Sequence, residues 1–182
     1  MPEPEQDYGT LERGEGTVTL HFTRRLAHPA EKVWRALTEQ QPLAAWFPTT
    51  IEGEFVPGAP LRFSFTRPAL PRMSGRMLAC EPPNLLEFVW DDETLRFELT
   101  AHESGTLLGF TATFAEKGKA ARDGAGWHVC LDRLAAAAGG HSAGWSEDER
   151  WREVHPYYVA AFGPDAATIG PPREWQDEFG PA

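Results

Sequence analysis

Residues 85–114 read LLEFVWDDETLRFELTAHESGTLLGFTATF, and this stretch decides the fold. Apolar and polar residues alternate in three successive runs, which is the two-residue period of strands that bury one face. Short polar turns separate the runs, so the three strands are expected to be antiparallel neighbours. A meander that is apolar on one face only needs a cover from elsewhere in the chain.

A long helix predicted over roughly 120–138 supplies that cover. Its apolar residues share one face at helical spacing: Trp127, Cys130, Leu131, Leu134 and Ala138. Gly139-Gly140 ends it. Gly124 and Gly126 lie in its first half, where each lowers helix propensity by about 1 kcal/mol relative to alanine. They indicate a frayed start, a close helix–sheet approach, or unfilled space beside the sheet.

The chain before the meander adds more strands and two short helices. A half-buried strand begins at Thr17, and Arg24 falls on its apolar face, so either the strand bulges there or an arginine points inward at the rim. Two short helices are predicted within 29–47, opened by Pro29 and Pro42. Further strands are expected between residues 51 and 80.

This order of elements predicts an α+β helix-grip fold. A curved antiparallel sheet of about seven strands surrounds the long C-terminal helix, with two short helices after the first strand. We expect a flexible N-terminus over 1–14, a helix-grip domain over 15–140, and an extension over 141–182 packed on that domain. The extension is rich in aromatic residues: Trp145, Trp151, Tyr157, Phe162, Trp175 and Phe179.

Bulk composition excludes several classes of function. The 182 residues carry a formal net charge of −10 and no basic stripe, which disfavours a nucleic-acid partner. No apolar stretch is long enough to predict a membrane span. Only Cys80 and Cys130 are present, without metal-ligand spacing, so a disulfide framework is not indicated and a cytoplasmic location is expected.

Several segments together resemble a known family. They are LAHPAEKVWRALT (26–38), WFP (46–48), EPPNLLEF (81–88) and GWHVCLDRL (126–134). As a set they resemble START-like proteins of the SRPBCC superfamily, and more specifically bacterial homologues of the activator of heat-shock-protein ATPase. The resemblance covers most of 17–164. It implies a helix-grip fold with a hydrophobic cavity between sheet and helix, and it implies no established activity.

The sequence Gly140-His-Ser-Ala-Gly144 matches the G-x-S-x-G motif of serine hydrolases. A nucleophile elbow needs a strand before the serine and a helix after it. Here Ser142 follows an alanine-rich helix, and Asp148 and His155 lie in the extension. We interpret the segment as a glycine-rich helix stop and assign no catalytic residue.

Metal and cofactor sites are not predicted either. None of the six histidines has ligand spacing, and His128, one position off the buried helix face, is interpreted as a solvated or rim residue. Asp91-Asp92-Glu93 is interpreted as a solvated hairpin tip.

The remaining candidate site is the predicted cavity. Its wall is expected to comprise Trp46, Phe63, Phe65, Met77, Phe88, Trp90, Phe97, Phe110, Gly126, Trp127, Cys130, Leu131 and Leu134. Arg24 and Arg76 are candidate polar groups at its rim. The alternative is that these aromatic residues form an ordinary core.

Three functions follow in order of preference. The first is a module that binds a small hydrophobic or amphipathic molecule. The second is an interaction protein with a chaperone or other protein partner, a homodimer included. The third is a cyclase- or hydratase-type enzyme, which would need an acid–base pair inside a cavity whose expected wall is almost entirely apolar.

Overall fold

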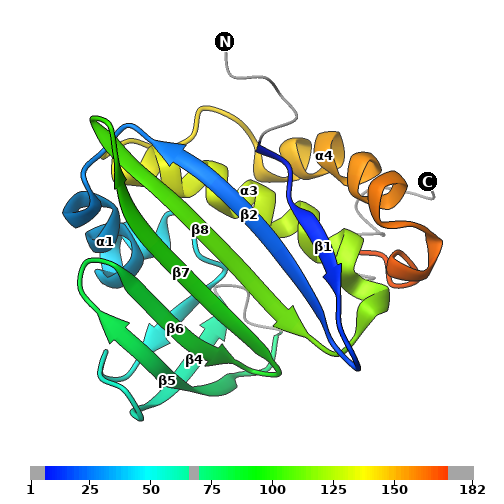
Figure 1. Ribbon diagram of the computed structural model, residues 1–182, viewed down its shortest axis with the longest axis horizontal. Coiled ribbons are helices and arrows are strands. Elements are labelled where there is room, and N and C mark those ends of the chain that lie inside the picture. Colours follow the sequence, from blue (N-terminus) through cyan, green and yellow to red (C-terminus); the bar gives the residue numbers. More distant parts are fainter. Residues whose placement is uncertain (1–6, 66–69, 172–182) are drawn as a thin grey trace.

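A computed structural model describes residues 7–65 and 70–171. Its centre is one antiparallel sheet with the strand order β1-β2-β8-β7-β6-β5-β4-β3. The strands are β1 (Thr10–Arg13), β2 (Val18–Leu26), β3 (Thr49–Glu52), β4 (Pro60–Phe65), β5 (Met73–Glu81), β6 (Leu85–Trp90), β7 (Glu93–His102) and β8 (Gly105–Phe114). The helices are α1 (Ala30–Thr38), α2 (Gln40–Ala44), α3 (Ala120–Ala138) and α4 (Glu147–Phe162), with short 3-10 turns η2 (Lys117–Lys119) and η3 (Pro164–Ala166). In Figure 1 the helices lie behind the curved sheet, and α3 crosses beneath β2 and β8.

The predicted meander is confirmed. Strands β6, β7 and β8 pair as antiparallel neighbours, and their buried and less buried residues alternate. Asp91 and Glu103 occupy the connecting turns with φ values of 58° and 50°, in the left-handed region that tight turns require. The chain has the expected helix-grip fold, because α3 covers the apolar face of this sheet, hereafter the inner face.

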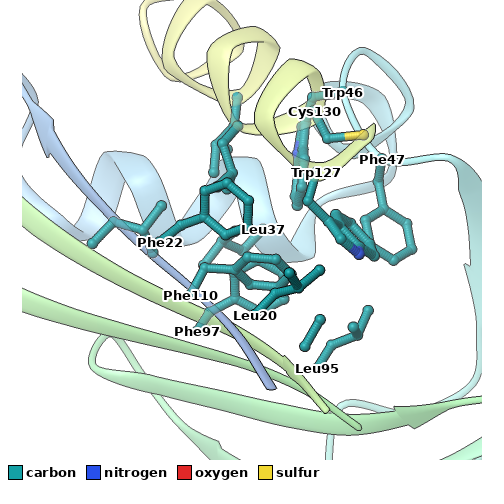
Figure 2. Close-up of a cluster of buried hydrophobic side chains, with 14 of the residues drawn as sticks. Leu20, Phe22, Leu37, Trp46, Phe47, Leu95, Phe97, Phe110, Trp127 and Cys130 are labelled. Atoms are coloured by element: carbon teal, nitrogen blue, oxygen red, sulfur yellow. The ribbon is translucent and has the colours of Figure 1, made fainter. Parts of the chain in front are cut away.

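Helix α3 packs on the inner face through its predicted apolar stripe. Figure 2 shows Trp127 pointing from α3 toward the strands, beside Phe47 and above Phe110. The ring centroids of Phe110 and Trp127 lie 4.9 Å apart, and those of Phe97 and Phe110 lie 4.7 Å apart. Both separations are typical of packed aromatic pairs, so this contact joins the helix to the middle of the sheet.

The N-terminal segment differs from the prediction. Residues 10–13, expected within a flexible region, form the edge strand β1, which raises the number of strands to eight. Backbone pairing with β2 orders this short strand, and Arg13 fastens it to the C-terminal part of the chain. The Arg13 guanidinium donates to the Phe162 carbonyl oxygen at 2.6 Å and lies 3.2 Å from the Asp165 carboxylate.

The extension contains one continuous helix, α4, with Pro156 inside it. Proline removes a backbone hydrogen bond, but burial of Val154, Tyr158 and Phe162 against the domain sustains the helix on both sides of it. Trp145 and Tyr157 are 38% and 40% exposed, so they are covered only in part, contrary to the expectation that the aromatic residues of the extension pack on the domain. Trp175 and Phe179 lie outside the described residues.

Among residues 7–65 and 70–171, no helix combines the length and the hydropathy needed to cross a membrane.

Candidate ligand-binding site

The residues predicted to line a cavity do converge between the sheet and α3, but they contact one another. Phe63, Phe88 and Phe97 are almost completely buried. Ring centroids lie 5.9 Å apart for Phe63 and Phe88, 6.3 Å for Phe88 and Phe97, and 5.9 Å for Trp46 and Phe97. Figure 2 shows Leu20, Phe97 and Phe110 gathered closely between α3 and the strands. These contacts favour the alternative in which the inner aromatic residues are ordinary core.

The other predicted wall residues divide by position. Met77, Cys130, Leu131 and Leu134 are buried with this core. Phe65 and Trp90 are only half-buried, and the Trp90 Nε1 donates to the Thr49 hydroxyl at 3.1 Å. Gly126 is half-buried, and a side chain there would meet open space.

The two candidate rim arginines differ. Arg76 is exposed and alternates with the buried Met77, so it lies on the outer face, and the prediction that it lines the rim is wrong. The side of Arg76 was hard to read from the sequence, because the register of β5 with β6 shifts between Met77 and Ala79 and the two-residue period is interrupted there. Arg24 is buried, with 5% of its surface exposed, and β2 pairs with β8 without a shift around it. It therefore points inward, as one of the two alternatives predicted.

A hollow of about 500 Å³ lies where Arg24 meets α3 and α4, and we name it the rim hollow. Its size is within the range of small-molecule sites. Of the predicted site residues, it contains Arg24 and Leu131. Its full lining is Asp7, Arg24, Arg25, Leu26, Leu131, Asp132, Ala135, Trp145, Glu149, Arg150 and Glu153.

Arg24 has an incomplete set of hydrogen-bond partners. Its Nη1 donates to the carbonyl oxygens of Asp7 and, at 3.3 Å, of Thr23. Its Nη2 lies 3.6 Å from Asp132 Oδ1, which is beyond hydrogen-bonding distance. The buried Nε and Nη2 have no hydrogen-bond partner within the described part of the chain. A buried charged donor without a partner is costly, so this residue is a candidate anchor for a ligand.

Asp132 stands between two guanidinium groups. Its Oδ2 accepts from Arg150 Nε at 3.0 Å and lies 3.5 Å from His128 Nε2. Burial acts to raise the pKa of Asp132, but the hydrogen bond and charge of His128, the charge of Arg24 and the hydrogen bond from Arg150 together lower it. Asp132 is therefore ionised at neutral pH.

His128 belongs to a buried polar group that the sequence analysis missed. It is 1% exposed, so the interpretation as a solvated or rim residue is wrong. Its Nδ1 lies 2.9 Å from the Tyr158 hydroxyl, which also accepts from the Gly9 backbone N–H at 3.0 Å. Burial raises the pKa of Tyr158. Because α4 and residues 8–9 cover this flank of α3, spacing within α3 could not reveal its burial.

A second buried polar group lies at the start of β7. Glu93 was predicted to be solvated, but it is 4% exposed, and its Oε1 lies 2.6 Å from Lys119 Nζ. Burial, followed by the charge of Asp123, raises the pKa of Glu93 to about 7, while Lys119 opposes the shift. The alternation of β7 already indicated this, because Glu93 is in phase with the inward Leu95 and Phe97.

Ser142 is exposed in the segment between α3 and α4, with a helix before it rather than a strand. The nucleophile-elbow geometry is thus missing at this serine. Within the described ranges, no cluster of at least three His, Cys, Asp or Glu side chains could hold a metal ion.

Residues 27–139 match the sequence profile of the family described as activator of Hsp90 ATPase homolog 1-like protein. The chain belongs to this family. The match spans more than half of the chain, and it ends before α4 and begins after β2. The rim hollow of this family member is therefore built partly outside the matched residues, because Arg24, Trp145 and Arg150 are supplied by those flanking segments. A comparison with curated proteins finds no match.

Several solved structures share the fold of this chain. The conserved protein of unknown function EF2215 from Enterococcus faecalis superimposes with a TM-score of 0.70 at 21% identity, covering 84% of this chain and 88% of its own. CalU16 from Micromonospora echinospora superimposes with a TM-score of 0.65 at 21% identity, covering 85% of this chain and 95% of its own. The protein encoded by gene BPP1335 from Bordetella parapertussis superimposes with a TM-score of 0.62 at 23% identity, covering 87% of this chain and 94% of its own. These likenesses establish the shared fold.

Proposed function

We propose that this family member binds a small amphipathic molecule, and that the molecule occupies the rim hollow. The observation that supports the proposal is the position of the buried Arg24, two of whose donor atoms have no partner among the described residues, in the wall of a hollow large enough for a ligand. The proposed site lies at the edge of the sheet–helix interface, beside the packed aromatic interior.

The lining of the rim hollow suits an amphipathic molecule. The half-buried Ala135 supplies apolar surface from α3, with the buried Leu26 and Leu131 beneath it, and Trp145 adds a partly exposed aromatic ring at the start of the extension. Charged side chains occupy the remaining wall. Small-molecule sites commonly combine an apolar surface with a few placed polar groups that fix orientation.

A reducing compartment, as in the cytoplasm, fits this proposal. Cys80 and Cys130 are both free thiols, and burial raises the pKa of each. Thiols remain free in a reducing compartment, and a thiol with a raised pKa is poorly reactive.

A filling variant tests the site. Ala135 is half-buried in the wall of the rim hollow, and Ala136, also half-buried, is the next residue of α3 but is absent from the lining. Titration with 8-anilinonaphthalene-1-sulfonate, followed by fluorescence and native mass spectrometry, should show saturable binding to the native parent. Ala135→Phe should weaken it by about tenfold or more, equivalent to about 1.4 kcal/mol.

Ala136→Phe is the matched control and should leave the dye affinity within about a factor of two, because a surface change away from the site has little effect. Equal affinities for the parent and both variants, or no saturable binding to the parent, would refute the rim hollow as the ligand site.

A further inference from the structure

We infer that the ligand of the rim hollow is a small amphipathic carboxylate, and that Arg24 binds its carboxylate group through the Nε–Nη2 edge. This inference rests on the proposed function and adds the chemical class of the ligand and the residue that selects it.

The first argument is the arrangement of the free donors. Nη1 of Arg24 is occupied by the carbonyl oxygens of Asp7 and Thr23, whereas Nε and Nη2 have no hydrogen-bond partner among residues 7–65 and 70–171. Nε and Nη2 lie on one side of the planar guanidinium, where their N–H bonds point in parallel. That edge matches the two oxygens of a carboxylate and favours bidentate binding. The carbonyl contacts of Nη1 hold the guanidinium in a fixed orientation.

The second argument is the balance of charge at the inner wall. Arg24 and Arg150 flank Asp132, so two guanidinium groups share one partly buried carboxylate. Glu149 and Glu153 are exposed at the mouth, where water screens their charge, and Glu153 is already paired with Arg150 at 3.0 Å. Within the described part of the chain, Asp132 is the carboxylate paired with Arg24, at 3.6 Å, and Arg150 shares it, so the charge of Arg24 is only partly compensated.

The third argument is the route to the donor edge. Asp132 Oδ1 is the nearest acid to Nη2 at 3.6 Å, while Asp132 Oδ2 is hydrogen-bonded to Arg150. Nε and Nη2 are themselves buried, so an entering carboxylate must displace Asp132 Oδ1 from beside Nη2, while Asp132 Oδ2 keeps its hydrogen bond to Arg150. Asp132 thus competes with the ligand for Arg24. Replacing Asp132 therefore tests the inference independently of replacing Arg24.

The decisive measurement compares an acid with its uncharged analogue. Isothermal titration of the full chain with 2-naphthoate and 2-naphthamide, at pH 7 and moderate salt, separates the charge of the head group from the apolar body. The parent should bind the acid at least about tenfold more tightly than the amide. Arg24→Gln should remove this preference, and Arg24→Lys should retain only part of it, because lysine keeps the charge but not the planar fork.

Two further variants make the test specific. Arg62→Gln is the control: Arg62 is exposed on β4 and is not part of the lining of the rim hollow, so the preference for the acid should change by less than about twofold. Asp132→Asn should tighten binding of the acid by about threefold or more without affecting the amide, since it removes the competing anion. If Arg24→Gln does not fold, as judged by circular dichroism, Arg24→Lys and Asp132→Asn decide the question.

The outcomes distinguish the inference from the proposed function. Equal affinity of the parent for acid and amide, both weakened by Ala135→Phe, overturns the carboxylate inference and leaves the binding function standing. If Asp132→Asn binds the acid more weakly than the parent does, the carboxylate inference is also overturned. If neither compound responds to Ala135→Phe, the rim hollow is not the site and both proposals fail.

Discussion

Replacing Gly126 by alanine is expected to stabilise the protein. Gly126 lies inside α3 without a positive φ. A Cβ built there has no atom within 4 Å other than those of the neighbouring residues and backbone of its own helix. The substitution therefore gains helix propensity and lowers the entropy of the unfolded chain without a clash. The expected gain is about 0.5–1 kcal/mol in the free energy of unfolding.

Gly124, two residues earlier in the same helix, should respond in the opposite direction. A Cβ there would lie 3.1 Å from Phe162 Cε2 and 3.1 Å from Tyr158 Cδ1. The hydroxyl of Tyr158 is bonded to Gly9 and lies beside His128, so its ring cannot easily move away. Overpacking costs about 1–3 kcal/mol and exceeds the propensity gain, which leaves a net loss of up to about 2 kcal/mol for Gly124→Ala.

Urea unfolding at equilibrium, followed by far-UV circular dichroism, measures both changes against the parent. The midpoint should rise for Gly126→Ala and fall for Gly124→Ala, with unchanged slopes. If Gly124→Ala is stabilised as much as Gly126→Ala, α4 does not pack on α3 in the way described. A destabilised Gly126→Ala would refute the inference of open space beside this residue.

Three further predictions concern buried polar groups and the extension. Because the pKa of Glu93 is raised from 4.5 to about 7, its protonated form stabilises the fold at low pH, and this contribution is lost as the pH rises through 7. Glu93→Gln should therefore gain stability relative to the parent between about pH 5 and 8 in urea unfolding; a pH-independent difference would contradict this. Removing all residues after Gly140 uncovers the flank of α3 and should lower the free energy of unfolding by several kcal/mol. Thermal unfolding measures the change, and an unchanged melting temperature would mean that α4 contributes nothing to stability. Tyr158→Phe leaves the Gly9 N–H and His128 without their shared hydroxyl and should cost about 1–3 kcal/mol in urea unfolding; a cost near zero would show that the hydroxyl is dispensable.

The elements that the sequence predicts well are those with a long, uninterrupted period. The ten-residue strands β7 and β8 and the 19-residue helix α3 each present enough turns or pleats for one face to be identified. Strand β1 has four residues and only Leu11 is partly covered, so no pattern distinguishes it from an irregular terminus. Its order comes from pairing with β2, which is a tertiary contact.

The candidate site was only partly predictable for the same reason. The inward direction of Arg24 follows from the period of β2, and Leu131 follows from the period of α3. The rim hollow, however, exists because α4 returns along α3, and the path of the chain after Gly140 is not encoded in any local period. The aromatic residues were correctly placed on the inner face, but a hydrophobic pattern does not distinguish a packed interior from an empty one.

Contacts between residues 8–13 and 157–165 join segments about 150 positions apart in the chain. Gly9 bonds to Tyr158, Tyr8 lies 3.9 Å from Tyr157 between ring centroids, and Arg13 bonds to the carbonyl oxygen of Phe162. Neither segment can detach without depriving the other of its partners, so the two form one cooperative unit that opens and closes together. In native-state hydrogen exchange their amides should share one opening free energy, lower than that of β7 and β8. Since α4 and Asp7 also wall the rim hollow, each such opening would expose Arg24 and provide an exchange route for a bound molecule.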